Sequence, residues 1–300
     1  MIKVLVVGGV TGSGKSTLSV KLAKLFNGEI ISGDSVAVYK ELTIGSAKIL
    51  PKDMDGIDHH GIDILSLQET FNVRDFQLYA RKKIDEIVAR GKLPIIVGGT
   101  GLYIRALLYD YVFLDEVETD MRWADSLTNE ALHDELSKVD KQQAQQIHAN
   151  NRKRVLRALS IAMVNQKSKT ELLSEQSHSM LYDAMILACT LPRTQLYTQL
   201  DIRVEKMMEA GLLEEVKQAV SLAGWDHPVM SAIGYKEFKD YFDEKISLDR
   251  AIALVQRNTR RFAKRQITWF MHQMPCRWVN MNDENDLDQA IEEVKVWMSR

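Results

Sequence analysis

The chain of 300 residues has little cysteine and no long hydrophobic run. Its two cysteines, Cys189 and Cys276, cannot form a disulfide framework, and no paired Cys/His spacing suggests a zinc site. Nowhere do about 18 apolar residues follow one another, so we expect no membrane span. These absences favour a cytoplasmic protein in a reducing compartment.

The sequence also lacks a large excess of either charge. It has 39 Lys and Arg against 41 Asp and Glu, a formal net charge of -2. This balance excludes a protein that coats nucleic acid by bulk positive charge, but it allows a local basic surface. The apolar run Ile2–Val10 breaks into glycines and lacks the small-residue pattern of a cleavage site. We therefore interpret it as a buried strand and not as a signal peptide.

Short β-rich apolar runs alternate with amphipathic helical patterns along most of the chain. This alternation predicts an α/β fold, a parallel sheet with helices on both faces. Together with the phosphate-binding motif described below, it predicts a P-loop NTPase-like sheet. The expected strands cover residues 3–7, 29–32, 94–98, 184–190 and 277–279. The expected helices cover residues 15–25, 74–90, 101–108, 193–210, 214–223, 248–272 and 287–297.

The strand patterns stop in the middle of the chain, where Glu, Gln, Ala, Leu and Lys dominate. We interpret residues 113–178 as a mostly helical insertion domain. The core then consists of a first part, residues 1–112, and a second part with C-terminal helices, residues 179–300. We find no internal repeat and no low-complexity segment.

A phosphate-binding motif follows the first expected strand. The stretch "GVTGSGKS" (residues 9–16) satisfies G-x-x-x-x-G-K-[ST], with a strand before it and a helix after it. Its backbone N–H groups and the helix N-terminus attract phosphate, Lys15 adds a cation, and the Ser16 hydroxyl can ligate Mg²⁺. The phosphate-binding residues expected here are Gly9, Val10, Thr11, Gly12, Ser13, Gly14, Lys15 and Ser16.

The motif alone does not say how the phosphates are used: hydrolysed, passed on by a kinase, or released as a leaving group. An NTPase normally places an Asp after another strand to hold Mg²⁺ and water, yet the strand at 94–98 leads into Gly98-Gly99-Thr100. The guanine-reading sequence Asn-Lys-x-Asp is also missing. A motor or switch function is therefore disfavoured.

Two polar side chains follow strands that we expect to end beside this motif. Asp34 and Ser35 come just after the second strand, at the edge where ligands gather in open parallel sheets. Asp34 suits a general base, an outer ligand of Mg²⁺ or a turn cap. Thr100, after the third strand, offers a donor and an acceptor and also suits a helix N-cap.

Two basic clusters stand out against the balanced charge. The first consists of Arg152, Lys153, Arg154 and Arg157, and the second of Arg257, Arg260, Arg261, Lys264 and Arg265. At helical spacing Arg257, Arg261, Lys264 and Arg265 share one face, which can neutralise nucleic-acid phosphates or form a solvated helix surface.

Other conspicuous residues have simpler interpretations. The side chains of His59 and His60 are adjacent and diverge, so we expect a structural role and not a metal site. Trp269 and Trp278 are expected in the core and not as stacking platforms for bases.

Taken together, these segments resemble the tRNA dimethylallyltransferase family, also called isopentenyl-tRNA transferases. Similar stretches recur in the family's order over nearly the whole chain: "IDHHGIDI" (57–64), "GGTGLYIRALL" (98–108), "IHANNRKRVLRAL" (147–159), "RTQLYTQLDIRVEKMMEAGLLEEV" (193–216), "MSAIGYKEF" (230–238) and "TRRFAKRQITWF" (259–270).

The resemblance implies transfer of a dimethylallyl group from dimethylallyl diphosphate to N6 of the adenosine beside the anticodon of a tRNA. The P-loop would then grip a diphosphate that leaves whole. The resemblance assigns catalytic roles to Asp34, Thr100 and Arg203, with Mg²⁺ as cofactor. No Cys/His zinc module follows residue 280, which favours a bacterial-type enzyme.

The partners implied are the tRNA anticodon stem-loop and dimethylallyl diphosphate, and we expect a monomer. By resemblance, the residues that would contact tRNA are Asp34, Ser35, Val36, Ala37, Thr100, Arg122, Lys153, Arg154, Val155, Leu156, Arg157, Ser231, Ala232, Ile233, Gly234, Tyr235 and Lys236. Ala37 stands where many members carry a Gln that could read a base.

Three alternatives remain. A P-loop small-molecule kinase could use the P-loop and Asp34 equally well. A prenyltransferase acting on free adenine nucleotides would act on AMP, and a non-catalytic RNA-binding P-loop protein would form no modified base.

Overall fold

The computed structural model describes residues 1–111, 113, 120–174 and 179–300, and the chain divides into two compact units. Unit 1 comprises Met1–Leu108 and Met180–Arg300, and unit 2 comprises Tyr109–Ser179. The domain boundaries expected at residues 112 and 178 fall on positions outside the described residues.

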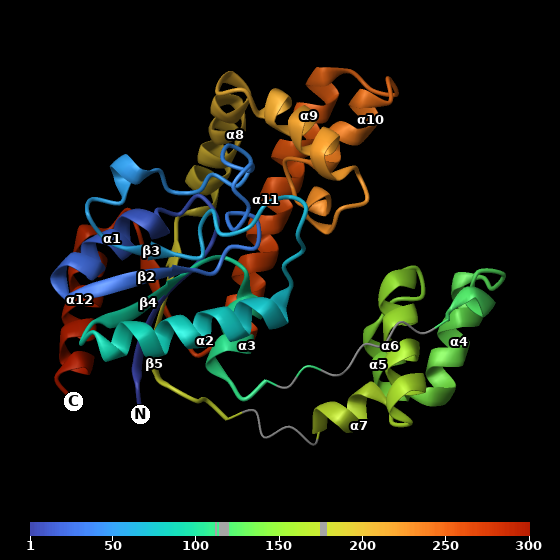
Figure 1. Ribbon diagram of the computed structural model, residues 1–300, viewed down its shortest axis with the longest axis horizontal. Coiled ribbons are helices and arrows are strands. Elements are labelled where there is room, and N and C mark those ends of the chain that lie inside the picture. The colour runs from blue at the N-terminus through green and yellow to red at the C-terminus, as the bar shows by residue number, and fades with distance from the viewer. Residues whose placement is uncertain (112, 114–119, 175–178) are drawn as a thin grey trace. The chain divides into compact units, whose positions relative to one another are not determined.

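Unit 1 is built on a parallel sheet, as the sequence predicts, with six strands where five were expected (Figure 1). The strand order is β3-β2-β4-β1-β5-β6, and β1 pairs with β4 on one side and β5 on the other. The strands are β1 Lys3–Gly9, β2 Gly28–Ser32, β3 His59–His60, β4 Leu93–Val97, β5 Asp183–Thr190 and β6 Arg277–Asn280. The carboxyl end of β1 therefore faces the crevice where the chain turns to opposite sides of the sheet, the usual ligand position in such folds.

Helices cover both faces of this sheet, which confirms the predicted fold class. Helix α1 (Lys15–Leu25) and helix α12 (Glu284–Met298) pack on one face, burying Leu18, Leu22 and Val294 in a common core. Helix α2 (Val73–Ala89), followed by α3 (Gly101–Leu108), covers the other.

A second core lies beyond the carboxyl ends of the strands. It joins Tyr39, Leu42 and Leu67 to α9 (Leu212–Ala223) and to the start of α11. The elements around it are α8 Arg193–Glu209, two short 3₁₀ turns at Pro228–Ser231 and Lys236–Phe238, α10 Lys239–Phe242, and α11 Leu248–Gln273. A further 3₁₀ turn, Pro51–Asp53, lies between β2 and β3 along the chain.

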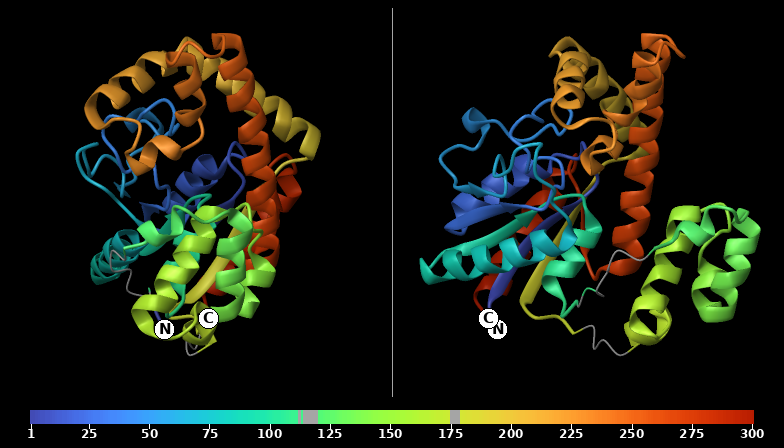
Figure 2. Two further views of the ribbon diagram at one scale, coloured as in Figure 1. Left: turned by 90° about the vertical axis from the view of Figure 1, so that its right-hand side faces the viewer. Right: turned by 45° about the vertical axis from the view of Figure 1, so that its right-hand side comes forward.

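Helix α11 runs from the second core to the sheet. Its first turns bury Ala251 and Val255 in the second core, while Phe270 near its end lies over β1. A Cβ atom at Gly8 would lie 2.7 Å from the Phe270 ring, so the strand needs a glycine there. Figure 2 shows α11 as the long orange helix that runs from α10 toward the sheet.

Unit 2 is helical in its described residues. It contains a 3₁₀ turn, Arg122–Ala124, and helices α4 Asn129–Val139, α5 Lys141–Gln146, α6 Arg152–Asn165 and α7 Lys169–Ser174. Leu132 and Leu136 of α4 pack against Val155, Ala158 and Leu159 of α6 in its own small core.

Within the parts of the chain that the structure describes, no helix is both long and apolar enough to cross a membrane.

Candidate active site

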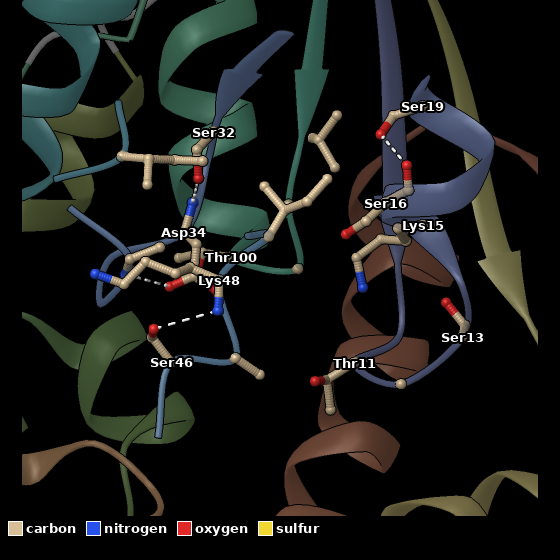
Figure 3. A pocket seen from close by; sticks show the side chains of 18 of the residues that line it. Thr11, Ser13, Lys15, Ser16, Ser19, Ser32, Asp34, Ser46, Lys48 and Thr100 are labelled. Carbon is tan, nitrogen blue, oxygen red and sulfur yellow. Dashed lines mark hydrogen bonds between the residues drawn. The ribbon is translucent and has the colours of Figure 1, made fainter. Parts of the chain in front are cut away.

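A cavity of about 310 Å³ opens at the carboxyl ends of β1, β2 and β4. Figure 3 shows the P-loop side chains on one side of it and Asp34, Ser46 and Thr100 on the other. Every residue that lines it belongs to unit 1. Its wall therefore comes from segments far apart in the sequence.

The P-loop has the geometry that its sequence predicts. Gly9, Gly12 and Gly14 all have positive φ, and a Cβ atom at Gly9 would lie 2.4 Å from the carbonyl oxygen of Cys189. Helix α1 starts directly after, at Lys15. Of the eight predicted phosphate-binding residues, Thr11 to Ser16 line the cavity, while Gly9 and Val10 form the buried approach to it.

Lys15 is the cation of the cradle and is half-buried. Its Nζ donates a hydrogen bond to the carbonyl oxygen of Val10 at 2.6 Å. Burial lowers the pKa of Lys15 to about 8, and the nearby charge of Arg203 lowers it while that of Asp34 raises it. An anion bound here would favour the protonated form.

Arg203 of α8 faces the same cavity. Burial lowers the pKa of this guanidinium, and Asp34 is the charge that opposes the shift. Two half-buried cations, Lys15 and Arg203, and the carboxylate of Asp34 thus line the same cavity. The two cations favour binding of a polyanion, and the carboxylate favours a polar group of a second ligand on the opposite side of the cavity.

Asp34 caps the turn after β2 with one of its oxygens. Its Oδ1 accepts hydrogen bonds from the N–H groups of Val36 (2.8 Å) and Ala37 (3.2 Å). One of the three roles weighed for Asp34, the turn cap, is therefore present. Among the described residues, Asp34 accepts these hydrogen bonds through Oδ1, which leaves Oδ2 for a substrate group.

Backbone contacts bring Thr100 beside Asp34. The N–H of Gly33 donates to the carbonyl of Val97 at 2.7 Å, and a Cβ atom at Gly98 would lie 2.7 Å from the carbonyl oxygen of Gly33. The loops after β2 and β4 are thus in direct contact. The Thr100 carbonyl accepts hydrogen bonds from the N–H groups of Tyr103 and Ile104 in α3, as expected of the residue before a helix.

A second cavity of about 320 Å³ adjoins the first. Both are lined by the same six residues, Thr11, Asp34, Ser46, Thr100, Arg203 and Phe262. The predicted catalytic residues Asp34, Thr100 and Arg203 therefore lie where the two cavities meet. The second cavity adds apolar walls from Leu200 and Met207 and cations from Lys236 and Arg265.

Most of the predicted RNA contacts of unit 1 line this second cavity. They are Ser35, Val36, Ser231, Ala232, Ile233, Gly234 and Lys236. Ala37 instead lines the first cavity and is 4% exposed. Tyr235 is fully buried, so its side chain supports this wall from the inside, and the predicted RNA contact of this residue would have to come from its backbone.

Tyr235 belongs to a network that sequence reasoning missed. The buried carboxylate of Glu215 accepts hydrogen bonds from the N–H groups of Thr43, Ile44 and Gly45 and from the Tyr235 hydroxyl, at 2.7–2.8 Å. These bonds fix the segment that leads to Ser46. In the sequence, Glu215 has only the signature of an ordinary acidic first turn of a helix.

Four of the five cations in the basic cluster of α11 are exposed. Arg257, Arg261, Lys264 and Arg265 are exposed, whereas Arg260 forms an ion pair with Asp201 of α8. Arg261, Lys264 and Arg265 also line a surface hollow with Trp269. Trp269 packs against Gly101, where a Cβ atom would lie 2.1 Å from the Trp269 ring. The Trp269 side chain is half-buried and not fully in the core.

The predicted residues of unit 2 have mixed surroundings. Lys153, Arg154 and Arg157 are exposed on α6, Leu156 is half-buried, and Arg122 forms an ion pair with Asp120 at 2.6 Å. Val155 is fully buried in the small core, so the predicted RNA contact of this residue would have to come from its backbone. Arg152 donates to the carbonyls of Ala124 and Leu127 and so holds the unit together.

The two adjacent histidines have structural contacts, as expected. His60 bonds to the buried carboxylate of Glu29 at 2.7 Å, and the His59 ring nitrogen bonds to the Ile57 carbonyl at 2.8 Å. Burial alone would raise the pKa of Glu29, but hydrogen bonds from Arg90, His60 and Lys92 lower it to about 2. This cluster stabilises the edge of the sheet.

A Mg²⁺ ion fits the donor set around Ser16. The Ser16 hydroxyl is exposed and lines the cavity, while the described residues contain no group of three or more His, Cys, Asp or Glu able to hold a metal. Mg²⁺ keeps most of its water and takes further oxygens from a phosphate ligand, so one hydroxyl beside a phosphate cradle suits it.

Comparison with known proteins identifies relatives over nearly the full length. The model of the IPP transferase family matches residues 37–273. A tRNA dimethylallyltransferase from Anoxybacillus flavithermus is 44% identical over 294 residues, which cover 97% of this chain and 94% of the relative. One from Bacillus velezensis is 44% identical over 297 residues, 97% of this chain and 95% of the relative.

Solved structures agree with these sequence relatives. A tRNA delta(2)-isopentenylpyrophosphate transferase from Staphylococcus epidermidis superposes with a TM-score of 0.73 at 38% identity, covering 99% of this chain and 98% of that one. A eukaryotic dimethylallyltransferase, described as acting on tRNA, gives a TM-score of 0.83 at 30% identity over 99% of this chain and 78% of that one.

Proposed function

Because the chain belongs to the IPP transferase family, we propose that it transfers a dimethylallyl group from dimethylallyl diphosphate to N6 of the adenosine beside the anticodon of tRNA. The products are N6-dimethylallyladenosine and diphosphate. The observation that carries the proposal is the position of Asp34, Thr100 and Arg203 between a phosphate cradle and a second, partly apolar cavity. The names of the relatives supply the substrate class.

The cradle stabilises the leaving group. As the bond between the allylic carbon and oxygen breaks, its electron pair stays on the diphosphate. The P-loop amides, Lys15 and Arg203 already face the cavity where that charge develops, so little reorganisation is needed during the reaction. The Ser16 hydroxyl would hold Mg²⁺, which supplies further positive charge beside the phosphate oxygens when bound.

Asp34 activates the attacking amine. The lone pair of an adenine amine is delocalised into the ring, so the group is a weak nucleophile and must lose a proton as its nitrogen bonds to the allylic carbon. The free Oδ2 of Asp34 accepts that proton, and the Thr100 side chain orients the amine.

The second cavity admits the nucleotide. A base must leave its stack before chemistry on its exocyclic group, and a single-stranded anticodon loop makes this easier. Lys236 and Arg265 in the cavity wall, and the exposed cations of α11, suit the phosphates of that loop. The exposed cations of α6 in unit 2 supply a further contact. Since one chain supplies every residue of the site, the proposal requires only a monomer.

A consumption assay tests this proposal against its alternatives. The protein is incubated with Mg²⁺, ATP, dimethylallyl diphosphate and either tRNA or AMP, and both phosphate donors are quantified. We expect dimethylallyl diphosphate to be consumed with tRNA present while ATP is retained. Consumption of ATP would favour a kinase, and modification of AMP would favour the free-nucleotide enzyme. Tight RNA binding without a modified base would indicate a binding protein.

A further inference from the structure

Gln266 joins the two sides of the first cavity. This side chain of α11 is only 5% exposed and lines the cavity. Its Oε1 accepts a hydrogen bond from the N–H of Thr11 in the P-loop at 2.9 Å. Its Nε2 donates to the carbonyl oxygen of Gly99, in the loop after β4, at 3.0 Å.

The loop after β4 packs closely against this contact. A Cβ atom at Gly99 would lie 2.2 Å from Nε2 of Gln266 and 3.2 Å from the carbonyl oxygen of Gly9. The loop is thus held between the P-loop and α11. The amide group of Gln266 thus bonds to a backbone N–H after β1 and to a backbone carbonyl after β4, and it fixes the distance between these two loops.

The same loop sets the position of the predicted base. Thr100 follows Gly99 directly, and Gly98 lies against Gly33, the residue before Asp34. A continuous series of contacts therefore runs from Thr11 through Gln266 and Gly99 to Gly33. It connects the diphosphate cradle to the groups that would activate the nucleophile.

We propose that Gln266 is a positioning residue: it sets the separation between the diphosphate cradle and the pair Thr100 and Asp34 without touching the reacting atoms. The inference rests on the proposed function, because only a reaction between two substrates held on opposite sides of the cavity requires this separation. In such a reaction the allylic carbon must lie in line between the leaving oxygen and the amine. An error of about 1 Å in such an arrangement can cost on the order of 100-fold in rate.

The test compares Gln266→Leu with Gln256→Leu. Gln256 lies on the same helix and is half-buried, but it lines neither cavity. The measurement is the single-turnover rate constant of prenyl transfer to tRNA at saturating dimethylallyl diphosphate and tRNA, with pyrophosphate affinity determined by calorimetry. For Gln266→Leu we expect a rate constant lower by on the order of 100-fold with unchanged pyrophosphate affinity. For Gln256→Leu we expect the wild-type rate.

Gln266→Glu supplies a second variant of the same shape. An ionised carboxylate still accepts from Thr11 but cannot donate to Gly99, whereas a protonated carboxyl does both. The rate relative to wild type at the same pH should therefore recover as the pH falls. A merely structural loss would reduce the active fraction, seen as the amplitude of the single turnover, and would leave the rate constant unchanged.

Wild-type rate constants in both Gln266 variants, or a loss of amplitude alone, would overturn the inference while leaving the proposed function intact. If Gln266→Leu does not fold, the pH recovery of Gln266→Glu decides, and a slow rate that is independent of pH relative to wild type counts against the inference. A wild-type protein that transfers no prenyl group would overturn the proposed function, and this inference with it.

Discussion

Asp34 serves the fold with one carboxylate oxygen and faces the cavity with the other. Oδ1 caps the turn by accepting from Val36 and Ala37, an arrangement that an asparagine side-chain oxygen can reproduce. The turn and the proposed proton transfer can therefore be separated by substitution.

Asp34→Asn should keep the turn and lose the base. We expect its thermal unfolding to match that of wild type and its rate of prenyl transfer to fall by about 100-fold or more, because positioned proton transfer contributes about that much. Asp34→Ala should lose both the rate and some stability. Unaltered turnover in Asp34→Asn would restrict Asp34 to its capping role.

The lowered pKa of Lys15 predicts how the affinity for diphosphate depends on pH. Burial lowers the pKa of this amine in the free protein to about 8, so Lys15 is charged below that pH and becomes neutral above it. Since a diphosphate binds the charged form, the affinity lost in Lys15→Met relative to wild type should be large near pH 7 and should shrink above about pH 8.

Pyrophosphate calorimetry across this pH range checks the prediction, and comparison between variants removes the ionisation of pyrophosphate itself. Lys21→Met is the matched control, because Lys21 lies on the same helix but is exposed and lines neither cavity. A difference between Lys15→Met and wild type that stays constant with pH would contradict the lowered pKa as the cause.

Among single residues, the sequence predicted those whose role can be identified from their neighbours in the chain. The P-loop could be identified because its glycines, lysine and serine are consecutive, and Asp34 because it follows a strand. Gln266 and Glu215 could not be identified in this way. Their partners Thr11 and Thr43 lie 255 and 172 residues away, and only the folded chain brings them together.

Helix α11 contributes residues to the protein core, to the two cavities and to the solvent-exposed surface. Its 26 residues bury Val255 and Phe270, place Phe262 and Gln266 at the cavities, and expose Arg261 and Lys264 to solvent. Because these sets occupy different faces, the exposed cations can be changed without altering the packing.

The double substitution Arg261→Glu with Lys264→Glu should weaken tRNA binding and leave pyrophosphate affinity unchanged. If each cation neutralises one phosphate, the slope of log affinity against log salt should decrease by about two. Arg250→Glu, an exposed change of the same sign at the start of α11, is the control. If the double variant and the control variant change the salt slope equally, the tRNA does not bind at Arg261 and Lys264.

Element types were predicted well and element ends less so. All five expected strands are present, because fully buried strands leave clear apolar runs. The two-residue strand β3 was missed because it is too short to show a period. Helix α12 begins at Glu284 and not at residue 287, since Asp283 caps a polar first turn that hydrophobic periodicity cannot detect.

Unit 2 is inserted through two chain segments that lie side by side. The N–H of Leu181 donates to the carbonyl of Leu108 at 2.8 Å in unit 1, and the N–H of Asp110 donates to the carbonyl of Ser179 at 3.0 Å in unit 2. A short linker can therefore replace the insertion without stretching the sheet.

Replacing residues 110–179 by a short Gly/Ser linker should leave unit 1 folded, because both of its cores and both cavities are its own. We expect pyrophosphate affinity to be retained and tRNA affinity to fall, since the exposed cations of α6 are lost. Circular dichroism, calorimetry and RNA binding check these outcomes. Full tRNA affinity in the shortened chain would show that unit 2 is not a tRNA-binding domain.

The central claim concerns the direction of a bound donor: its diphosphate in the P-loop and its allylic carbon turned toward Asp34 and Thr100, where the second cavity begins. A crystal structure with an uncleavable analogue of dimethylallyl diphosphate tests this most directly. We predict the β-phosphate on the amides of residues 12–16 and the allylic carbon at the junction of the two cavities. An isoprenoid tail turned away from Asp34, or a diphosphate bound outside the P-loop, would contradict the account.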